Sequence, residues 1–221
     1  MTWNACSTSD WRLYVILDAG VLRGRDVVEV ARAAMDGGAD VLQYRDKTGS
    51  AREMLRQVER LVPVCRDADV PLIVNDHLDI ARLAGAAGVH LGQDDLPVAK
   101  ARMLAGERMW IGQSTHSVEQ LERAAAEPVT YIAVGPVFPT PTKPTYDSIG
   151  LSLIREAAQR LRHPWLAIGG IDLTNIDQVL EAGATRVAVV RAVAGAEDIT
   201  SAARAIKQRL REHLVPRSGD H

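Results

Sequence analysis

The stretch GGADVLQY, from Gly37 to Tyr44, joins the end of one expected helix to a short apolar strand. Glycine at a helix C-terminus readily takes the left-handed conformation that closes the last turn. The same kind of small-residue connector leads into an apolar run twice more, in GAAGVHL (85–91) and in GATRVAVV (183–190). The chain therefore repeats a helix-to-strand half-unit, and this repetition is typical of alternating βα folds.

Short apolar runs alternate with longer Ala-rich amphipathic runs on both sides of this stretch. Strands are predicted at residues 13–17, 41–44, 72–74, 89–91, 110–112, 131–134, 165–168 and 186–190. Helices are predicted at residues 26–36, 51–69, 79–84, 97–105, 117–126, 151–161, 174–182 and 198–214. Eight parallel strands with right-handed crossovers close a barrel, whereas fewer would form an open sheet. We therefore expect one α/β domain, a (β/α)8 TIM barrel over residues 12–214, with flexible termini at 1–11 and 215–221.

Composition and charge limit the kinds of molecule that the protein is expected to bind and the compartment in which it is expected to act. Hydrophobic residues make up 47% of the chain, which is enough for a full core. The 26 basic and 28 acidic residues nearly cancel, and no Lys/Arg cluster indicates binding to nucleic acid or to a membrane surface. No apolar run is long enough to span a membrane, and no signal-peptide pattern begins the sequence. Cys6 and Cys65 lie far apart and are interpreted as free thiols, so we expect a cytoplasmic protein.

Polar residues that follow the strands are the candidate site residues, because the carboxyl ends of the strands form the catalytic face of such a barrel. Gln43, Arg45 and Lys47 share one face if their strand continues, and Arg with Lys suits a cluster of anionic oxygens. A solvated charged loop is the alternative. Ser114 follows the fifth strand, where it could bind a ligand or cap the next helix.

Two acidic segments follow neighbouring strands. Asp76, and either Asp94 or Asp95, could share one cation, since Mg²⁺ binds few carboxylates and completes its shell with substrate phosphate. Helix N-capping is the alternative role for these residues. The histidines that follow strands or lie within them, His77, His90 and His116, have no evident partners in the sequence and are interpreted as structural or surface residues.

Phosphate-binding signals lie on the other side of the expected barrel. Gly169 and Gly170 follow the seventh strand and Val190-Arg191 follows the eighth, where barrels often bind phosphate through backbone N–H groups. The long loop at 135–148 holds four prolines and the segment PTPTK, whose hydroxyls and ammonium suit a phosphate. That loop could act as a lid or clamp, or be a rigid surface loop. Two separated phosphate sites imply two phosphorylated substrates or one long one.

Six motifs, in order and at plausible spacing, resemble those of the thiamine-phosphate synthase (thiamine-phosphate pyrophosphorylase) family. They are LYVILD (13–18), QYRDK (43–47), ND (75–76), GVHLGQDD (88–95), GPVFPTPTK (135–143) and AIGGI (167–171). The resemblance extends from about Leu13 to Ala192, and the last motif alone is shared with other phosphate-binding barrels. Two positions depart from the family pattern: Arg191 stands where Ser is frequent, and His77 where Arg is frequent.

The resemblance implies a division of the site residues among two substrates and Mg²⁺. Residues implied for the aminopyrimidine diphosphate are Gln43, Tyr44, Arg45, Asp46, Lys47, Asn75, Ser114 and Lys143. Asp76 and Asp95 are implied as Mg²⁺ ligands. Residues implied for the thiazole phosphate are Thr140, Pro141, Thr142, Gly170, Val190 and Arg191.

The activity that the resemblance implies is a transferase reaction of thiamine biosynthesis. An aminopyrimidine methyl diphosphate and a thiazole phosphate, carboxylated or not, would give thiamine monophosphate and pyrophosphate, with carbon dioxide also lost from the carboxylated form and with pyrophosphate departing first. A thiazole tautomerase and a non-catalytic thiamine-phosphate-binding regulator of the same fold are the alternatives within the family. A phosphosugar isomerase is the alternative that the phosphate-binding signals alone permit. The partners are then two small phosphorylated heterocycles, and association into homo-oligomers through the helix layer stays open.

Overall fold

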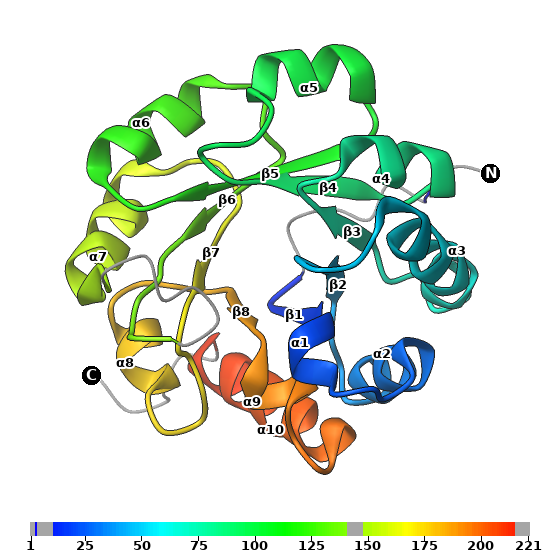
Figure 1. Cartoon of the computed structure of the whole chain (residues 1–221). Coiled ribbons are helices and arrows are strands. Elements are labelled where there is room, and N and C mark those ends of the chain that lie inside the picture. The colour runs from blue at the N-terminus through cyan, green and yellow to red at the C-terminus, as the bar shows by residue number, and fades with distance from the viewer. Residues whose placement is uncertain (1–2, 4–10, 141–147, 215–221) are drawn as a thin grey trace.

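The chain forms a closed barrel of eight parallel strands in sequential order, surrounded by helices (Figure 1). The computed structural model describes residues 3, 11–140 and 148–214. The strands are β1 (Leu13–Asp18), β2 (Val41–Arg45), β3 (Leu72–Asn75), β4 (Gly88–Leu91), β5 (Trp110–Thr115), β6 (Tyr131–Val134), β7 (Trp165–Ile168) and β8 (Val187–Val189). The ring closes through β1 and β8, where Leu13 pairs with Val187. The predicted TIM barrel is confirmed.

The helices lie outside the strands, as the alternating pattern predicts. They are α1 (Ala19–Leu22), α2 (Val27–Asp36), α3 (Ala51–Asp67), α4 (Leu78–Ala84), α5 (Val98–Ala105), α6 (Val118–Ala126), α7 (Gly150–Arg160), α8 (Ile176–Glu181), α9 (Arg191–Ala194) and α10 (Ile199–Leu214). The sequence did not predict α1 and α9, because a four-residue helix is too short to show an amphipathic period. None of the helices in the described part of the chain combines the length and apolar character needed to cross a bilayer.

Two apolar layers stabilise the barrel. The larger layer lies between the strands and the helices and contains outward-facing strand residues such as Leu42 and Val74. The smaller one fills the barrel interior with inward-facing residues, among them Trp11, Tyr14 and Tyr131. Strand alternation therefore decides which residues can reach the carboxyl ends of the strands from inside the barrel.

An ion pair ties the last helix to the amino ends of the strands. Asp40, directly before β2, pairs with Lys207 of α10, and the Lys207 side chain is only 9% exposed. The Asp40 Oδ2 atom also accepts hydrogen bonds from the backbone N–H groups of Arg12 (2.7 Å) and Leu13 (2.8 Å). This carboxylate thus joins α10 to the start of β1, where the ring of strands closes.

Candidate active site

A cavity of about 440 Å³ opens at the carboxyl ends of the strands. Its volume lies in the range of small-molecule sites, which is roughly 300–1,000 Å³. The predicted site residues that line it come from strands on all sides of the barrel: Gln43, Arg45, Asn75, Ser114, Thr140, Gly170, Val190 and Arg191. Pro141, Thr142 and Lys143 lie outside the described residues.

Strand β2 directs Gln43 and Arg45 into the cavity. Both residues are in the inward register, while Leu42 and Tyr44 alternate with them and belong to the outer core. The Arg45 guanidinium pairs with the carboxylate of Asp18, its partner in the β1–β2 register, and the two side chains are 12% and 10% exposed. Asp18 also accepts a hydrogen bond from the Gly20 N–H (3.1 Å), which caps α1. Arg45 is therefore held at the cavity edge by a carboxylate that is itself fixed.

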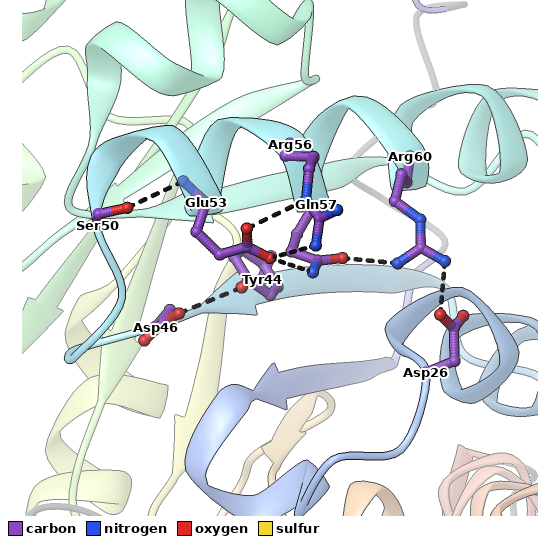
Figure 2. A network of polar contacts seen from close by, with 8 residues as sticks. All are labelled: Asp26, Tyr44, Asp46, Ser50, Glu53, Arg56, Gln57 and Arg60. Atoms are coloured by element: carbon purple, nitrogen blue, oxygen red, sulfur yellow. Dashed lines mark hydrogen bonds and ion pairs between the residues drawn. The ribbon is translucent and has the colours of Figure 1, made fainter.

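Tyr44 and Asp46 lie outside the cavity lining. Figure 2 shows the Tyr44 hydroxyl between β2 and α3, directed to Asp46 at 3.4 Å and on the helix side of the strand. Asp46 caps its own turn by accepting hydrogen bonds from the N–H groups of Thr48 (2.9 Å) and Gly49 (2.8 Å). Strand alternation places Tyr44 outward, and this turn occupies the carboxylate of Asp46, so the structure does not bring either side chain to the cavity.

Asp76, Asp95 and Lys47 form a charged cluster beside Asn75. Asp76 has a backbone φ of 63°, a left-handed conformation that is uncommon for non-glycine residues and that Asp tolerates better than most. Its carboxylate pairs with the ammonium of Lys47, and its N–H donates to the His90 carbonyl at the end of β4 (2.8 Å). The Asp95 Oδ2 atom accepts a hydrogen bond from the Gly92 N–H (2.6 Å). The ends of β3 and β4 thus bring the two carboxyl groups together.

The contact between the two carboxyl groups is electrostatically unfavourable when both are charged. Burial raises the pKa of Asp95, and the hydrogen bond and repulsion from Asp76 raise it further, while Lys47 acts in the opposite direction. Asp94 is exposed, so Asp95 is the residue of the pair that faces Asp76. A cation bound between Asp76 and Asp95 would remove the repulsion.

The donor set at this cluster fits Mg²⁺. Carboxylate oxygens are the hard ligands that Mg²⁺ prefers, and it commonly takes one or two of them together with water and substrate phosphate. Among the residues that the structure describes, no group of three or more His, Cys, Asp or Glu side chains could hold a metal by itself. A cation at Asp76 and Asp95 would therefore need further oxygen ligands from a bound molecule.

The opposite side of the cavity presents a glycine turn, with Asp172 and Arg191 also in the lining. Gly169 and Gly170 have φ values of 105° and 64°, and a Cβ on Gly170 would lie 2.8 Å from the Cβ of Phe138. The Phe138 N–H donates to the Gly169 carbonyl (3.0 Å), so the segment that leads to Thr140 runs alongside the glycines. Asn175 donates from Nδ2 to the Gly170 carbonyl (2.8 Å) and fixes this turn.

Helix α9 begins at Arg191, next to this glycine turn in the cavity lining. The first turn of a helix leaves backbone N–H groups without partners inside the helix, and these groups attract anions. Thr140, Gly170, Val190 and Arg191, which the resemblance implies for one phosphate, all line this cavity.

Comparison with known proteins assigns the chain to a family. The family model described as thiamine monophosphate synthase matches residues 13–193, which is most of the barrel. The chain belongs to the thiamine monophosphate synthase family. Thiamine-phosphate synthases from Chloroflexus aurantiacus and Acidothermus cellulolyticus are 47% and 48% identical to it over 199 and 206 residues. These alignments cover 90% and 92% of this chain and 92% and 97% of the relatives.

A solved structure gives the same assignment. Thiamine phosphate pyrophosphorylase from Pyrococcus furiosus superposes with a TM-score of 0.85 at 34% sequence identity, covering 94% of this chain and 99% of that one. The chain is accordingly an enzyme, a transferase of thiamine biosynthesis with the TIM-barrel fold.

Several residues at the cavity of this synthase-family member were not among the residues predicted from the sequence. Tyr14, His90 and Tyr131 line the cavity from inside the barrel, and Asp18 and Asn175 fix residues that face it. The only signal for the first three is that they are polar or aromatic groups within apolar strands. Alternation from Ile16 would have placed Tyr14 on the inward face. The sequence predicts a structural or surface role for His90 and His116, and the structure places both in the lining.

Proposed function

We propose that this protein condenses an aminopyrimidine methyl diphosphate with a thiazole phosphate, giving thiamine monophosphate and pyrophosphate. One observation supports this most strongly: one side of the cavity is lined by Arg45 and Asn75, with the cluster of Lys47, Asp76 and Asp95 beside Asn75 just outside the lining, and another side by the turn after β7 and the residues after β8. The first suits a metal-bound diphosphate, and the second suits a phosphate monoester. The two anions would then enter one cavity from opposite sides.

The diphosphate would bind to the cationic side. Arg45 and Lys47 would neutralise its oxygens, and Asn75 would donate a hydrogen bond. We propose the same role for Lys143, which lies outside the described residues. Gln43 and Ser114, both buried and in the lining, would hold the aminopyrimidine ring. We leave Tyr44 and Asp46 out of this site because they face the helix layer.

Asp76 and Asp95 would hold Mg²⁺. When it is bound, Mg²⁺ supplies positive charge that favours departure of the pyrophosphate. Lys47 pairs with Asp76 in this structure and would be free to contact the diphosphate once the acidic pair binds a cation.

The thiazole phosphate would bind at the turn after β7. The Gly170 and Val190–Arg191 backbone, together with Thr140, would receive the phosphate oxygens. We propose the same for Pro141 and Thr142, which lie outside the described residues. Arg191 is exposed at the cavity edge, and its guanidinium could replace the serine hydroxyl that is frequent in the family.

The chemistry needs charge stabilisation more than a protein nucleophile. The C–O bond to the diphosphate breaks with its electron pair going to pyrophosphate, and the aminopyrimidine ring carries the positive charge. The thiazole nitrogen then forms the new C–N bond. The tasks of the protein are to neutralise the leaving group, align the two rings and exclude water from the cavity.

Pyrophosphate release tests the proposal. We expect release when both substrates and Mg²⁺ are present, none with either substrate alone, and loss of release on addition of EDTA. A thiazole tautomerase would instead transform the thiazole phosphate alone without metal. A regulator would be stabilised by the ligands without turnover. Running the assay with the carboxylated and the decarboxylated thiazole phosphate would identify the preferred form.

A further inference from the structure

A chain of hydrogen bonds crosses the barrel interior beneath the cavity and links five buried side chains. Gln43 donates from Nε2 to the Tyr14 hydroxyl (2.8 Å), and the hydroxyls of Tyr14 and Tyr131 lie 2.9 Å apart. His90 contacts the Tyr131 hydroxyl through Nδ1 (3.0 Å) and the Ser114 hydroxyl through Nε2 (2.9 Å). This chain of hydrogen bonds thus connects Gln43 and Ser114, which we propose hold the pyrimidine. The three residues between them have no role in the proposed function so far.

The direction of the hydrogens along this chain follows from its first donor. Burial raises the pKa of both Tyr14 and Tyr131, so each phenol keeps one hydrogen to donate. Tyr14 accepts from the amide nitrogen of Gln43 and gives its own hydrogen to Tyr131. Tyr131 then gives its hydrogen to Nδ1 of His90, which must carry its single hydrogen on Nε2 and donate to Ser114.

The opposite direction of donation, from His90 toward Tyr14, leaves one hydrogen without an acceptor. If His90 donated from Nδ1 to Tyr131, and Tyr131 to Tyr14, the Tyr14 oxygen would receive two hydrogens. Its own hydrogen would then have no acceptor among the residues that the structure describes. An unsatisfied buried donor is costly, so the first direction is favoured.

One glycine lies directly against this chain of hydrogen bonds. Gly112 of β5 lies against the contact between Tyr131 and His90, whose rings stack with centroids 5.6 Å apart. A Cβ at Gly112 would lie 2.4 Å from the Tyr131 hydroxyl oxygen and 2.6 Å from Nδ1 of His90. A side chain at position 112 would therefore overlap the hydrogen bond between Tyr131 and His90, and glycine avoids this overlap.

We propose that Tyr14, Tyr131 and His90 are positioning residues that fix the hydrogen-bond polarity of the pyrimidine subsite. Ser114 accepts from His90, so its O–H is directed to a ligand as a donor. Gln43 uses its nitrogen on Tyr14, which leaves its carbonyl oxygen as the acceptor. A ligand fits this pair if its edge presents a ring nitrogen, which accepts, beside an exocyclic amine, which donates. An oxo ring presents N–H beside C=O, which is the opposite pattern. This inference rests on the proposed function.

Discrimination between an amino and an oxo ring tests this inference. The probes are the aminopyrimidine methyl diphosphate and its oxo analogue, each assayed for pyrophosphate release with thiazole phosphate and Mg²⁺. Tyr131→Phe keeps the ring and removes the hydroxyl. We expect it to lower the amino-to-oxo ratio of kcat/KM roughly tenfold relative to the wild type, as the loss of one oriented hydrogen bond would. Comparing ratios removes the difference in intrinsic reactivity between the two rings.

Thr115→Val provides a matched control. Thr115 is the next residue of β5 after Ser114, is fully buried, and donates its hydroxyl hydrogen to the Ala133 carbonyl (2.9 Å) instead of to the chain. We expect the discrimination ratio of this variant to match the wild type even if its stability falls. An equal loss of discrimination in Thr115→Val and Tyr131→Phe would overturn the inference, as would an unchanged ratio in Tyr131→Phe.

A spectroscopic measurement is independent of activity. In protein labelled with ¹⁵N-histidine, the six histidines are observed together, and the His90 signal is the one that disappears in His90→Gln. We expect His90 to be neutral with its hydrogen on Nε2. A hydrogen on Nδ1 would contradict the inference even if the protein is an active synthase. Conversely, the expected tautomer in a protein that releases no pyrophosphate would contradict the proposed function alone.

Discussion

The two ends of the barrel both carry ion pairs, and they use them differently. At the amino ends of the strands, Asp40 binds Lys207 and two backbone N–H groups, so its acceptor capacity is used within the protein. At the carboxyl ends, Asp76 and Asp95 face one another, and a single lysine that is 51% exposed partly offsets them. The first arrangement is complete without a ligand, while the second becomes favourable only when a cation or an anion joins it.

The largest expected effect comes from removing a charge at the incomplete end. Asp76→Asn keeps the side-chain shape and removes one metal ligand, so we expect kcat/KM for pyrophosphate release to fall by about 10²–10³, as for loss of a strong transition-state contact. Its thermal unfolding midpoint should stay the same or rise, because the repulsion with Asp95 is removed. Asp94→Asn is the control, since Asp94 is exposed and its loss should change neither quantity. A comparable loss of rate in both variants would argue against Asp76 as a ligand.

The next effect concerns stability at the complete end. Lys207→Met leaves the Asp40 carboxylate without its cation, and breaking a buried pair costs about 3–5 kcal/mol of unfolding free energy. Urea unfolding measures this loss, and kcat at 25 °C should remain that of the wild type. Lys100→Met replaces an exposed lysine of α5 and serves as the matched control, with no expected change. If Lys207→Met instead lowered kcat at a temperature where it is fully folded, the separation between the two ends would not hold.

A smaller effect is expected at the pair between β1 and β2. Asp18→Asn retains the hydrogen bond that caps α1 but removes the charge that holds Arg45, so we expect KM for the pyrimidine diphosphate to rise about tenfold. Steady-state kinetics at saturating thiazole phosphate would measure it. A fall in KM would show instead that Asp18 competes with the diphosphate for Arg45. Asp46→Asn, on the neighbouring turn, should leave KM unchanged, because the Asp46 side chain accepts hydrogen bonds from the N–H groups of its own turn.

The sequence predicted the architecture well because the fold depends on local patterns. Glycine connectors and alternating apolar runs indicated eight strands and the helices between them, and within the described residues only the four-residue helices α1 and α9 were missed. The site was harder to predict because it depends on contacts between distant strands. The residue pattern alone left Asp94 and Asp95 as alternatives; the family resemblance implied Asp95, and in the structure Asp95 is the one that faces Asp76.

Strand alternation decided which predicted residues reached the site. It directed Gln43 inward and Tyr44 outward within the same QYRDK motif, although the family resemblance had implied both for one substrate. His90 and Tyr131 could not be recognised as neighbours from the sequence, because 41 residues separate them along the chain. Local periodicity predicts the direction of a side chain, whereas its partner depends on the closed register of the barrel.

The smallest expected effect is at the surface network on α3. It tests whether burial of the charges is what makes the Asp40–Lys207 ion pair at the amino end of the barrel stabilising. Figure 2 shows Arg60 linked to Gln57 on its own helix and to Asp26 at the start of α2. Its side chain is 42% exposed and that of Asp26 is 35% exposed, so water screens the pair and the ordering of long side chains offsets the attraction. We expect Arg60→Ala to leave both the urea midpoint and kcat/KM within experimental error. A loss as large as that of Lys207→Met would mean that joining neighbouring elements, and not burial of the charge, makes the Asp40–Lys207 pair stabilising.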